Sequence, residues 1–216
     1  MYRACLIGTH HTLNRCVQTE MTDKEQKYYE RIKSSFIGQT IKEVYYEELD
    51  YDTDSEFWEM SDEIHSVDMN VIFKLDNDQF MQIKWDNEFY CYGVGFENLQ
   101  EIIKREGVKT INVSNNSNWE KLIGKTINEI KVLWDISKVV TATYSGNKII
   151  KTENSITKLP QTWELNLDNE KVWISALEID DDKRTNFCAD HLSVIFTTCE
   201  QEKYKLIEKA STQQCI

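Results

Sequence analysis

A nine-residue stretch occurs twice in this chain and constrains the fold more than any other feature. Residues 36–44 read Phe-Ile-Gly-Gln-Thr-Ile-Lys-Glu-Val, and residues 122–130 read Leu-Ile-Gly-Lys-Thr-Ile-Asn-Glu-Ile. A second echo follows each copy in the same order, at residues 73–78 and 165–170, where Leu-Asp-Asn precedes an acidic residue. Two ordered matches at similar offsets predict a duplicated structural unit. Chance similarity between short strings is the alternative.

The duplication leads us to expect an α+β protein with two related halves, each a helix leading into a mainly antiparallel β-sheet. We expect residues 36–100 and 122–197 to superpose. The polar, turn-forming run at residues 114–118 is the predicted boundary. The expected organisation is a poorly ordered leader at 1–20, a first repeat at 21–113, a second repeat packed on it at 114–210, and a frayed tail at 211–216.

In the first half, apolar spacing and turn chemistry predict the elements. The opening helix covers residues 22–35, with Thr22 or Asp23 as its cap. Further expected elements are a strand at 40–49, a hairpin of 71–75 with 80–85 around an Asx-rich turn, a strand at 89–94, a helix at 97–106 that ends before Gly107, and a strand at 108–113.

The second half is expected to repeat this plan. A short helix capped by Ser117 or Asn118 leads into it, and Pro160 is expected at a strand start or edge. The other expected elements are a strand at 126–134, a pair at 139–144 and 148–151, a hairpin of 163–167 with 172–179, a strand at 191–198 and a helix at 200–209.

Composition limits the function classes. Hydrophobic residues make up 40% of the 216 residues, enough for a folded core. The 37 acidic and 25 basic residues give a charge of -12, which disfavours nucleic-acid backbones and anionic membrane surfaces as partners. With no long apolar run and no signal-peptide pattern, we expect a cytoplasmic protein. Its six cysteines lack regular spacing and are expected to be free thiols: Cys5, Cys16, Cys91, Cys188, Cys199 and Cys215.

One segment concentrates the acidic charge. Residues 47–63 hold nine carboxylates and no Lys or Arg, so we expect a long connection or a solvated helix. Trp58 is an unusual residue in such surroundings and fits an anchor at a protein interface. The candidate partner-binding residues are Glu47, Glu48, Asp50, Tyr51, Asp52, Asp54, Glu56, Trp58, Glu59, Asp62 and Glu63. The alternative is a solvated loop.

No motif assigns a catalytic, metal or cofactor site, and none is predicted. Asp50, Asp52 and Asp54 have a calcium-loop spacing, but Ser55 and Ser61 replace the required Gly and Glu. Cys188 and His191 lie three residues apart without a second pair to complete a zinc site. The chain has no nucleotide-binding fingerprint.

Two function classes remain. The first is a binding protein that engages a basic protein partner through its acidic segment. Small acidic bacterial immunity proteins, which neutralise basic nuclease toxins, illustrate this class by size and charge alone. The alternative is an enzyme that processes a small molecule or carbohydrate with paired carboxylates such as Asp62, Glu63 or Asp68. A flat or convex acidic face favours the first, and a deep pocket with converging carboxylates the second.

Overall fold

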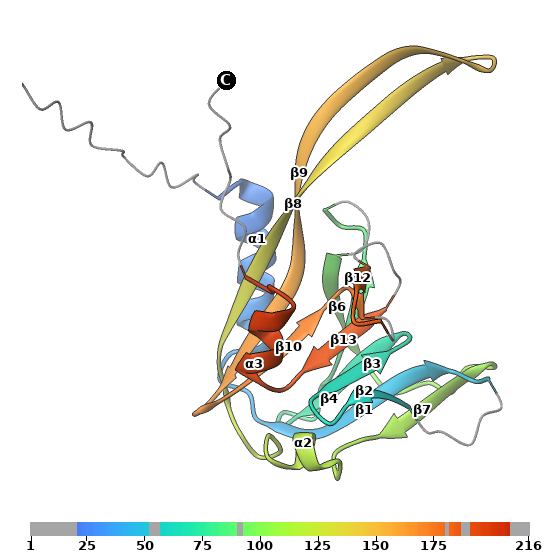
Figure 1. Ribbon diagram of the computed structural model, residues 1–216. Helices are drawn as coiled ribbons and strands as arrows, with labels where there is room; N and C mark the ends of the chain where they lie inside the picture. Colours follow the sequence, from blue (N-terminus) through green and yellow to red (C-terminus); the bar gives the residue numbers. More distant parts are fainter. Residues whose placement is uncertain (1–20, 52–56, 90–92, 180–181, 187–190, 208–216) are drawn as a thin grey trace, which may run out of the picture.

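The computed structural model describes residues 21–51, 57–89, 93–179, 182–186 and 191–207 (Figure 1). The helices are α1 (Asp23–Phe36), α2 (Ser117–Glu120) and α3 (Thr198–Lys203). The strands are β1 (Ile41–Leu49), β2 (Trp58–Ser61), β3 (Ile64–Val67), β4 (Asn70–Leu75), β5 (Phe80–Asp86), β6 (Gly93–Leu99), β7 (Val108–Asn112), β8 (Ile127–Ser145), β9 (Lys148–Leu167), β10 (Glu170–Ser175), β11 (Glu178–Ile179), β12 (Thr185–Asn186) and β13 (Leu192–Ile195).

The strands form two main antiparallel sheets, with a few short helices, so the fold is roughly α+β, as expected. One sheet has five strands in the order β6-β5-β4-β1-β7, and the other has six in the order β2-β3-β13-β10-β9-β8. Strands β11 and β12 make a separate ladder. Long-range antiparallel pairing, more than helix packing, therefore organises this molecule.

The hairpin of β2 and β3 crosses from one sheet to the other. In sequence it lies between β1 and β4, which are neighbours in the five-stranded sheet. In space β3 pairs with β13, from Leu192 opposite Val67 to Ile195 opposite Ile64. A segment of the N-terminal half thus completes the six-stranded sheet, with β2 as its edge strand.

Helix α1 begins where the sequence indicates. Thr22 is the N-cap, its side chain accepts a hydrogen bond from the Glu25 amide, and Glu25 bonds back to the Thr22 amide in a capping box. The apolar face at Tyr28, Ile32 and Phe36 is fully buried. The helix packs along the base of β8 and β9 (Figure 1).

Both sheets contribute to one buried core. From the five-stranded sheet come residues such as Val44 and Phe73, and from the six-stranded sheet Trp163 and Leu165. A smaller cluster covers the other face of the six-stranded sheet beneath α3: Ile64, Trp173, Leu177, Ile179, Ile195, Tyr204 and Leu206. All four residues of β13 are buried, Ser193 included, because the two clusters cover both faces of this sheet.

The two copies of the repeated stretch contact each other. Thr40 and Thr126 form an isolated antiparallel bridge. Gly38 and Gly124 precede them with φ angles of 83° and 79°, a left-handed conformation that glycine adopts without a Cβ clash. Each glycine amide then bonds to the strand entering the other half, Gly38 to the Ile127 carbonyl and Gly124 to the Ile41 carbonyl.

The strand pairs that follow the two copies have corresponding registers. In β1 and β4, Ile41 lies opposite Leu75, and a bulge follows before Glu43 meets Lys74. In β8 and β9, Ile127 lies opposite Leu167, and a bulge follows before Glu129 meets Asn166. The next strand pairs antiparallel in each case, as β5 on β4 and β10 on β9.

Strands β8 and β9 continue past the rest of the sheet as a two-stranded ribbon (Figure 1). Residues 139–144 and 148–151, expected as a separate strand pair, are the end of these strands, which turn at Gly146. Pro160 lies inside β9 and not at a strand start. A register shift between Leu133 and Trp134 on β8 falls opposite it and accommodates its missing amide hydrogen.

The expected helix at 97–106 is wrong. Residues 93–99 form β6; of the expected strand at 89–94, residues 93 and 94 belong to β6, and residues 90–92 lie outside the described residues. The helical spacing of Leu99, Ile102 and Ile103 was misleading because pairing with β5 overrides it: Phe96 lies opposite Ile83 and Leu99 opposite Phe80.

In its described residues, 47–51 and 57–63, the acidic segment is neither one long connection nor a helix. Glu47 and Glu48 belong to β1, and Trp58–Ser61 form β2. The cap of α2 is Asn116 instead of Ser117 or Asn118. The closing helix starts two residues early, at Thr198, and ends at Lys203.

The two ends of the chain were expected to be poorly ordered. The leader at residues 1–20 and the tail at 211–216 lie outside the described residues. Among the helices that the structure describes, none has the length and apolarity needed to cross a bilayer.

Candidate functional site

The first carboxylate of the acidic segment, Glu47, is buried on β1 with 2% of its surface exposed. Its Oε2 accepts hydrogen bonds from Asn70 Nδ2 at 2.6 Å, Gln82 Nε2 at 2.7 Å and Arg105 Nη2 at 2.8 Å. Burial of a charge is tolerated when it is paired and hydrogen-bonded. Glu47 therefore holds the loop at Arg105 against the five-stranded sheet.

The second carboxylate, Glu48, is buried without such compensation. Its Oε2 accepts from the Asp68 amide at 2.9 Å, but its Oε1 has no partner among the described residues. Burial, with the Asp68 charge adding to it, raises the pKa of Glu48 to about 8. Glu48 is thus protonated at neutral pH and adds no negative charge to the surface.

The middle of the acidic segment is partly exposed. Asp50 forms an ion pair with Lys109 at 3.1 Å, and the Tyr51 side chain is 65% exposed. The remaining candidates here, Asp52, Asp54 and Glu56, lie outside the described residues. Two basic residues distant in sequence therefore compensate the negative charge of two members of the segment: Arg105 pairs with Glu47, and Lys109 pairs with Asp50.

The end of the segment presents an aromatic side chain at a sheet edge. Trp58 is 59% exposed on β2, the outermost strand of the six-stranded sheet. Glu59 follows it, also exposed, and its Oε1 accepts from Asn116 Nδ2 at 3.0 Å. A large apolar side chain beside carboxylates is exposed here, as the acidic surroundings of Trp58 indicate.

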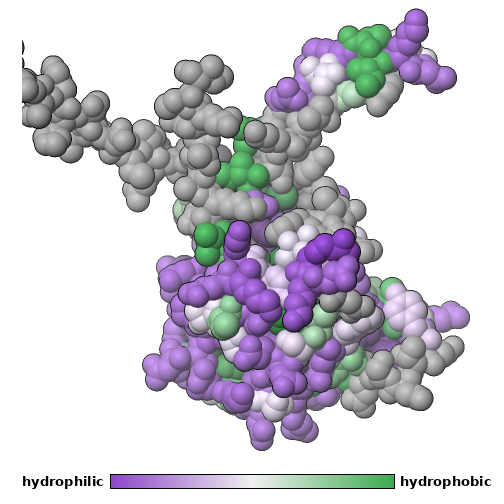
Figure 2. Space-filling model, in the orientation of Figure 1, coloured by the Kyte–Doolittle hydropathy of each residue, from purple (hydrophilic) through white to green (hydrophobic). Residues whose placement is uncertain are grey.

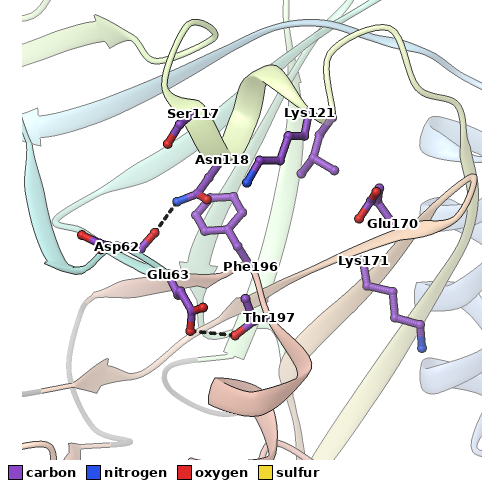
Figure 3. Close-up of a pocket in the computed structure, with 10 residues that line it drawn as sticks. Asp62, Glu63, Ser117, Asn118, Lys121, Glu170, Lys171, Phe196 and Thr197 are labelled. Carbon is purple, nitrogen blue, oxygen red and sulfur yellow. Dashed lines mark hydrogen bonds between the residues drawn. The ribbon is translucent and has the colours of Figure 1, made fainter.

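The turn between β2 and β3 borders an open groove of about 510 Å³ (Figure 3). Asp62 and Glu63 lie on this turn and face residues of α2, β10 and the start of α3. The lining residues are Asp62, Glu63, Ser117, Asn118, Lys121, Leu122, Glu170, Lys171, Phe196 and Thr197. Two hydrogen bonds fix the turn, from Asn118 Nδ2 to the Asp62 carbonyl at 2.7 Å and from Thr197 Oγ1 to Glu63 at 3.1 Å.

The groove is polar and of mixed charge. Lys121 and Lys171 line it together with the three carboxylates of Asp62, Glu63 and Glu170. Lys171 is held at 2.7 Å by Glu164, which lies outside the groove lining. This arrangement can receive a polar or charged group from a partner. The carboxylates do not form a purely acidic cluster, because two lysines lie among them.

Beside the groove lies a series of buried hydrogen bonds between side chains, which the sequence did not predict. Trp119 Nε1 donates to the Tyr46 hydroxyl at 2.6 Å, and that hydroxyl lies 2.8 Å from Nδ1 of His65. The ring of Phe196 packs on His65 with centroids 4.7 Å apart. Burial lowers the pKa of His65 to about 4, so its imidazole is neutral at physiological pH. No short-range pattern signals contacts between residues so far apart in sequence.

The carboxylates of the enzyme alternative are divided between two places. Asp62 and Glu63 border the groove, whereas Asp68 is paired with His191 at 2.9 Å and is not part of the groove lining. Cys188, considered with His191, lies outside the described residues. Among the residues described, no group of three His, Cys, Asp or Glu side chains has the geometry of a metal site.

Comparisons with protein-family models, with curated proteins and with solved structures found no match to this chain.

Proposed function

We propose that this protein is a binding module that engages a basic protein partner through the face formed by β2, the β2–β3 turn and the adjoining groove. We call this surface the acidic face and define it by Trp58, Glu59, Asp62 and Glu63. Glu47 and Glu48 are buried and do not belong to it.

The observation that carries the proposal is the exposure of Trp58 at a sheet edge among carboxylates. Aromatic residues are enriched at interface hot spots, because they bury much apolar area with little loss of conformational freedom. Glu59 and Asp62 add a negative field that speeds encounter with a basic surface. The open groove offers room for a Lys or Arg side chain of the partner. An inhibitor of a basic nuclease toxin is one form that such a module takes.

The test compares baits that differ only at the acidic face. Wild-type protein and a Glu59→Gln/Asp62→Asn variant would be used to capture partners from the native cell extract. The control, Glu129→Gln/Glu202→Gln, removes the same charge elsewhere. We expect a basic protein that the wild type and the control retain and the acidic-face variant loses, with association slowed about tenfold at low salt. Equal capture by all three baits contradicts the proposal.

A separate variant tests the aromatic anchor. Trp58→Ala should accelerate partner dissociation with little change in the salt dependence of association, because the lost contact is apolar. Ile207→Ala is the matched control, since Ile207 is 60% exposed and lies outside the acidic face. Identical dissociation rates for the two variants would remove Trp58 from the interface.

We also propose that the two halves derive from one duplicated unit. Support comes from the matching bulges after Ile41 and Ile127, from the two left-handed glycines and from the corresponding strand orders. The test exchanges residues 38–44 with residues 124–130: Gln39, Lys42 and Val44 are replaced by Lys, Asn and Ile, and the reverse is done at 125, 128 and 130. Equivalent environments predict near wild-type stability. Unfolding of the exchanged chain, with each single substitution tolerated, contradicts the proposal.

A further inference from the structure

The ribbon that extends from the six-stranded sheet is a surface that the proposed function does not use. We call it the arm and define it as residues 136–156 of β8 and β9. Its strands pair with each other up to Ser145 opposite Lys148, whereas β10 pairs with β9 only from Thr162 to Leu167. No third strand among the described residues covers the arm, and nine residues of extended strand give it a reach of about 30 Å.

The arm differs from the rest of the molecule in charge. Residues 136–156 hold three lysines, Lys138, Lys148 and Lys151, and one acidic residue, Glu153, which pairs with Lys151, in a chain whose overall charge is -12. The body therefore carries the whole excess of acidic residues, while the arm is cationic.

The arm also exposes apolar side chains. Ile149, Ile150 and Ile156 are 58%, 64% and 72% exposed, and apolar atoms gather at its end (Figure 2). Isoleucines exposed at such a position, beside lysines, indicate a surface that becomes covered by a partner. The partner surface must be anionic and must offer apolar area.

We infer that the arm docks on the acidic face of a second copy of this chain. That face combines the exposed Trp58 with Glu59 and Asp62, and so complements isoleucines and lysines at once. Pairing of two arms is disfavoured, because it brings like charges together. Phosphate-rich surfaces, such as anionic lipid or nucleic acid, are disfavoured by the acidic body behind the arm. The inference rests on the proposed role of the acidic face as a docking surface.

The experiment uses two charge-reversed full-length chains. The arm variant is Lys148→Glu/Lys151→Glu, and the face variant is Glu59→Lys/Asp62→Lys. Molar mass would be followed by light scattering over a concentration series at low and high salt. We expect the wild type to self-associate at low salt and to dissociate as salt rises. Each variant alone should associate at least about tenfold more weakly, since its docking surfaces now repel.

Mixing the two variants is the decisive step. The reversed arm of one then meets the reversed face of the other, and the remaining arm meets the remaining acidic face, so the mixture should recover the wild-type mass. A wild type that is monomeric at low salt, or variants that associate like the wild type, overturns the inference. If Glu59→Lys unfolds the chain, the same mixing is done with Asp62→Lys alone.

Other outcomes separate this inference from the proposed function. Phosphatidylserine vesicles or duplex DNA that bind a monomeric wild type and not the arm variant overturn the second copy as occupant. A monomeric wild type whose acidic face still captures a basic protein overturns the self-association alone. Recovery of mass on mixing, without capture of any basic protein, supports the self-association and contradicts the foreign partner.

Discussion

The hydroxyl oxygens of Thr40 and Thr126 lie 3.3 Å apart, so the two copies of the repeated stretch meet at the same residue of each. Their backbones are joined by further hydrogen bonds, such as Ile41 N to the Lys125 carbonyl at 3.1 Å and Ile127 N to the Gln39 carbonyl at 2.9 Å. The entry points of β1 and β8 therefore support each other, and a change in one copy alters the setting of the other.

We predict that Gly38→Ala and Gly124→Ala each lower the free energy of unfolding by about 1–2 kcal/mol, the penalty of an L side chain in the left-handed region. Because the two sites belong to one hydrogen-bonded junction, with Gly38 bonded to Ile127 and Gly124 to Ile41, the double variant should depart from the sum of the single effects. Gly146→Ala, at the end of the arm with φ 58°, is the control and should combine additively with Gly38→Ala. Urea unfolding of the three single and two double variants measures these free energies, and strict additivity at the junction contradicts the prediction.

The raised pKa of Glu48 predicts a stability that falls as pH rises. The unfolded chain releases this proton near pH 4.5, whereas the folded protein holds it until about pH 8. The stabilising effect of the buried proton is therefore complete below about pH 4.5 and is lost on the way to pH 8. Glu48→Gln should raise the unfolding free energy at pH 8 by on the order of 3 kcal/mol, and by little at pH 5. Thermal melts at both pH values, with exposed Glu170→Gln as control, check this; equal gains at both contradict it.

His65 should remain neutral in the folded protein well below pH 6. Its pKa is lowered to about 4, so the unfolded chain takes up a proton below about pH 6.5 while the folded protein does not. The low pKa of His65 thus lowers the free energy of unfolding as pH falls from about 6.5 to 4. The raised pKa of Glu48 acts in the opposite direction. Side-chain NMR titration, with His65→Gln to assign the signal, measures the pKa directly. A midpoint near 6.5 would show that the imidazole is solvated.

Removal of the arm should leave the body intact. Replacing residues 139–155 by Asn-Gly closes the pair of Lys138 and Ile156 with a favoured two-residue turn. Because no third strand packs on the arm in the described structure, the unfolding free energy should change by less than about 1 kcal/mol. Leu165→Ala, at a fully buried position, is the comparison and should lower it by about 2–5 kcal/mol. A loss from arm removal as large as that of Leu165→Ala would show that the arm supports the core.

The sequence predicted elements whose signals are local. Thr22, one of the two predicted caps, defined the start of α1, and the Asx turn at residues 76–79 defined the hairpin of β4 and β5. It failed at Leu99, where helical spacing competed with a partner strand that is not adjacent in sequence. Pairing with Phe80 on β5 determined the outcome.

In the candidate site, too, features set by sequence neighbours were predictable and those set by distant residues were not. The exposure of Trp58 follows from its acidic neighbours. The burial of Glu47 does not, because it depends on Asn70, Gln82 and Arg105, which reach it from three other segments. Charge density alone therefore overstates the acidity of the surface, since Glu47 is neutralised and Glu48 is protonated.

The crossing of β2 and β3 into the opposite sheet joins the two parts of the chain in one direction, from the N-terminal part to the C-terminal part. The N-terminal half supplies every strand of the five-stranded sheet, whereas the six-stranded sheet is incomplete without that half, because β13 then lacks its neighbour β3. A protease cut at residues 114–118 would consequently release no C-terminal fragment with a complete sheet. The two fragments would stay associated as a non-covalent complex and would unfold in a single transition.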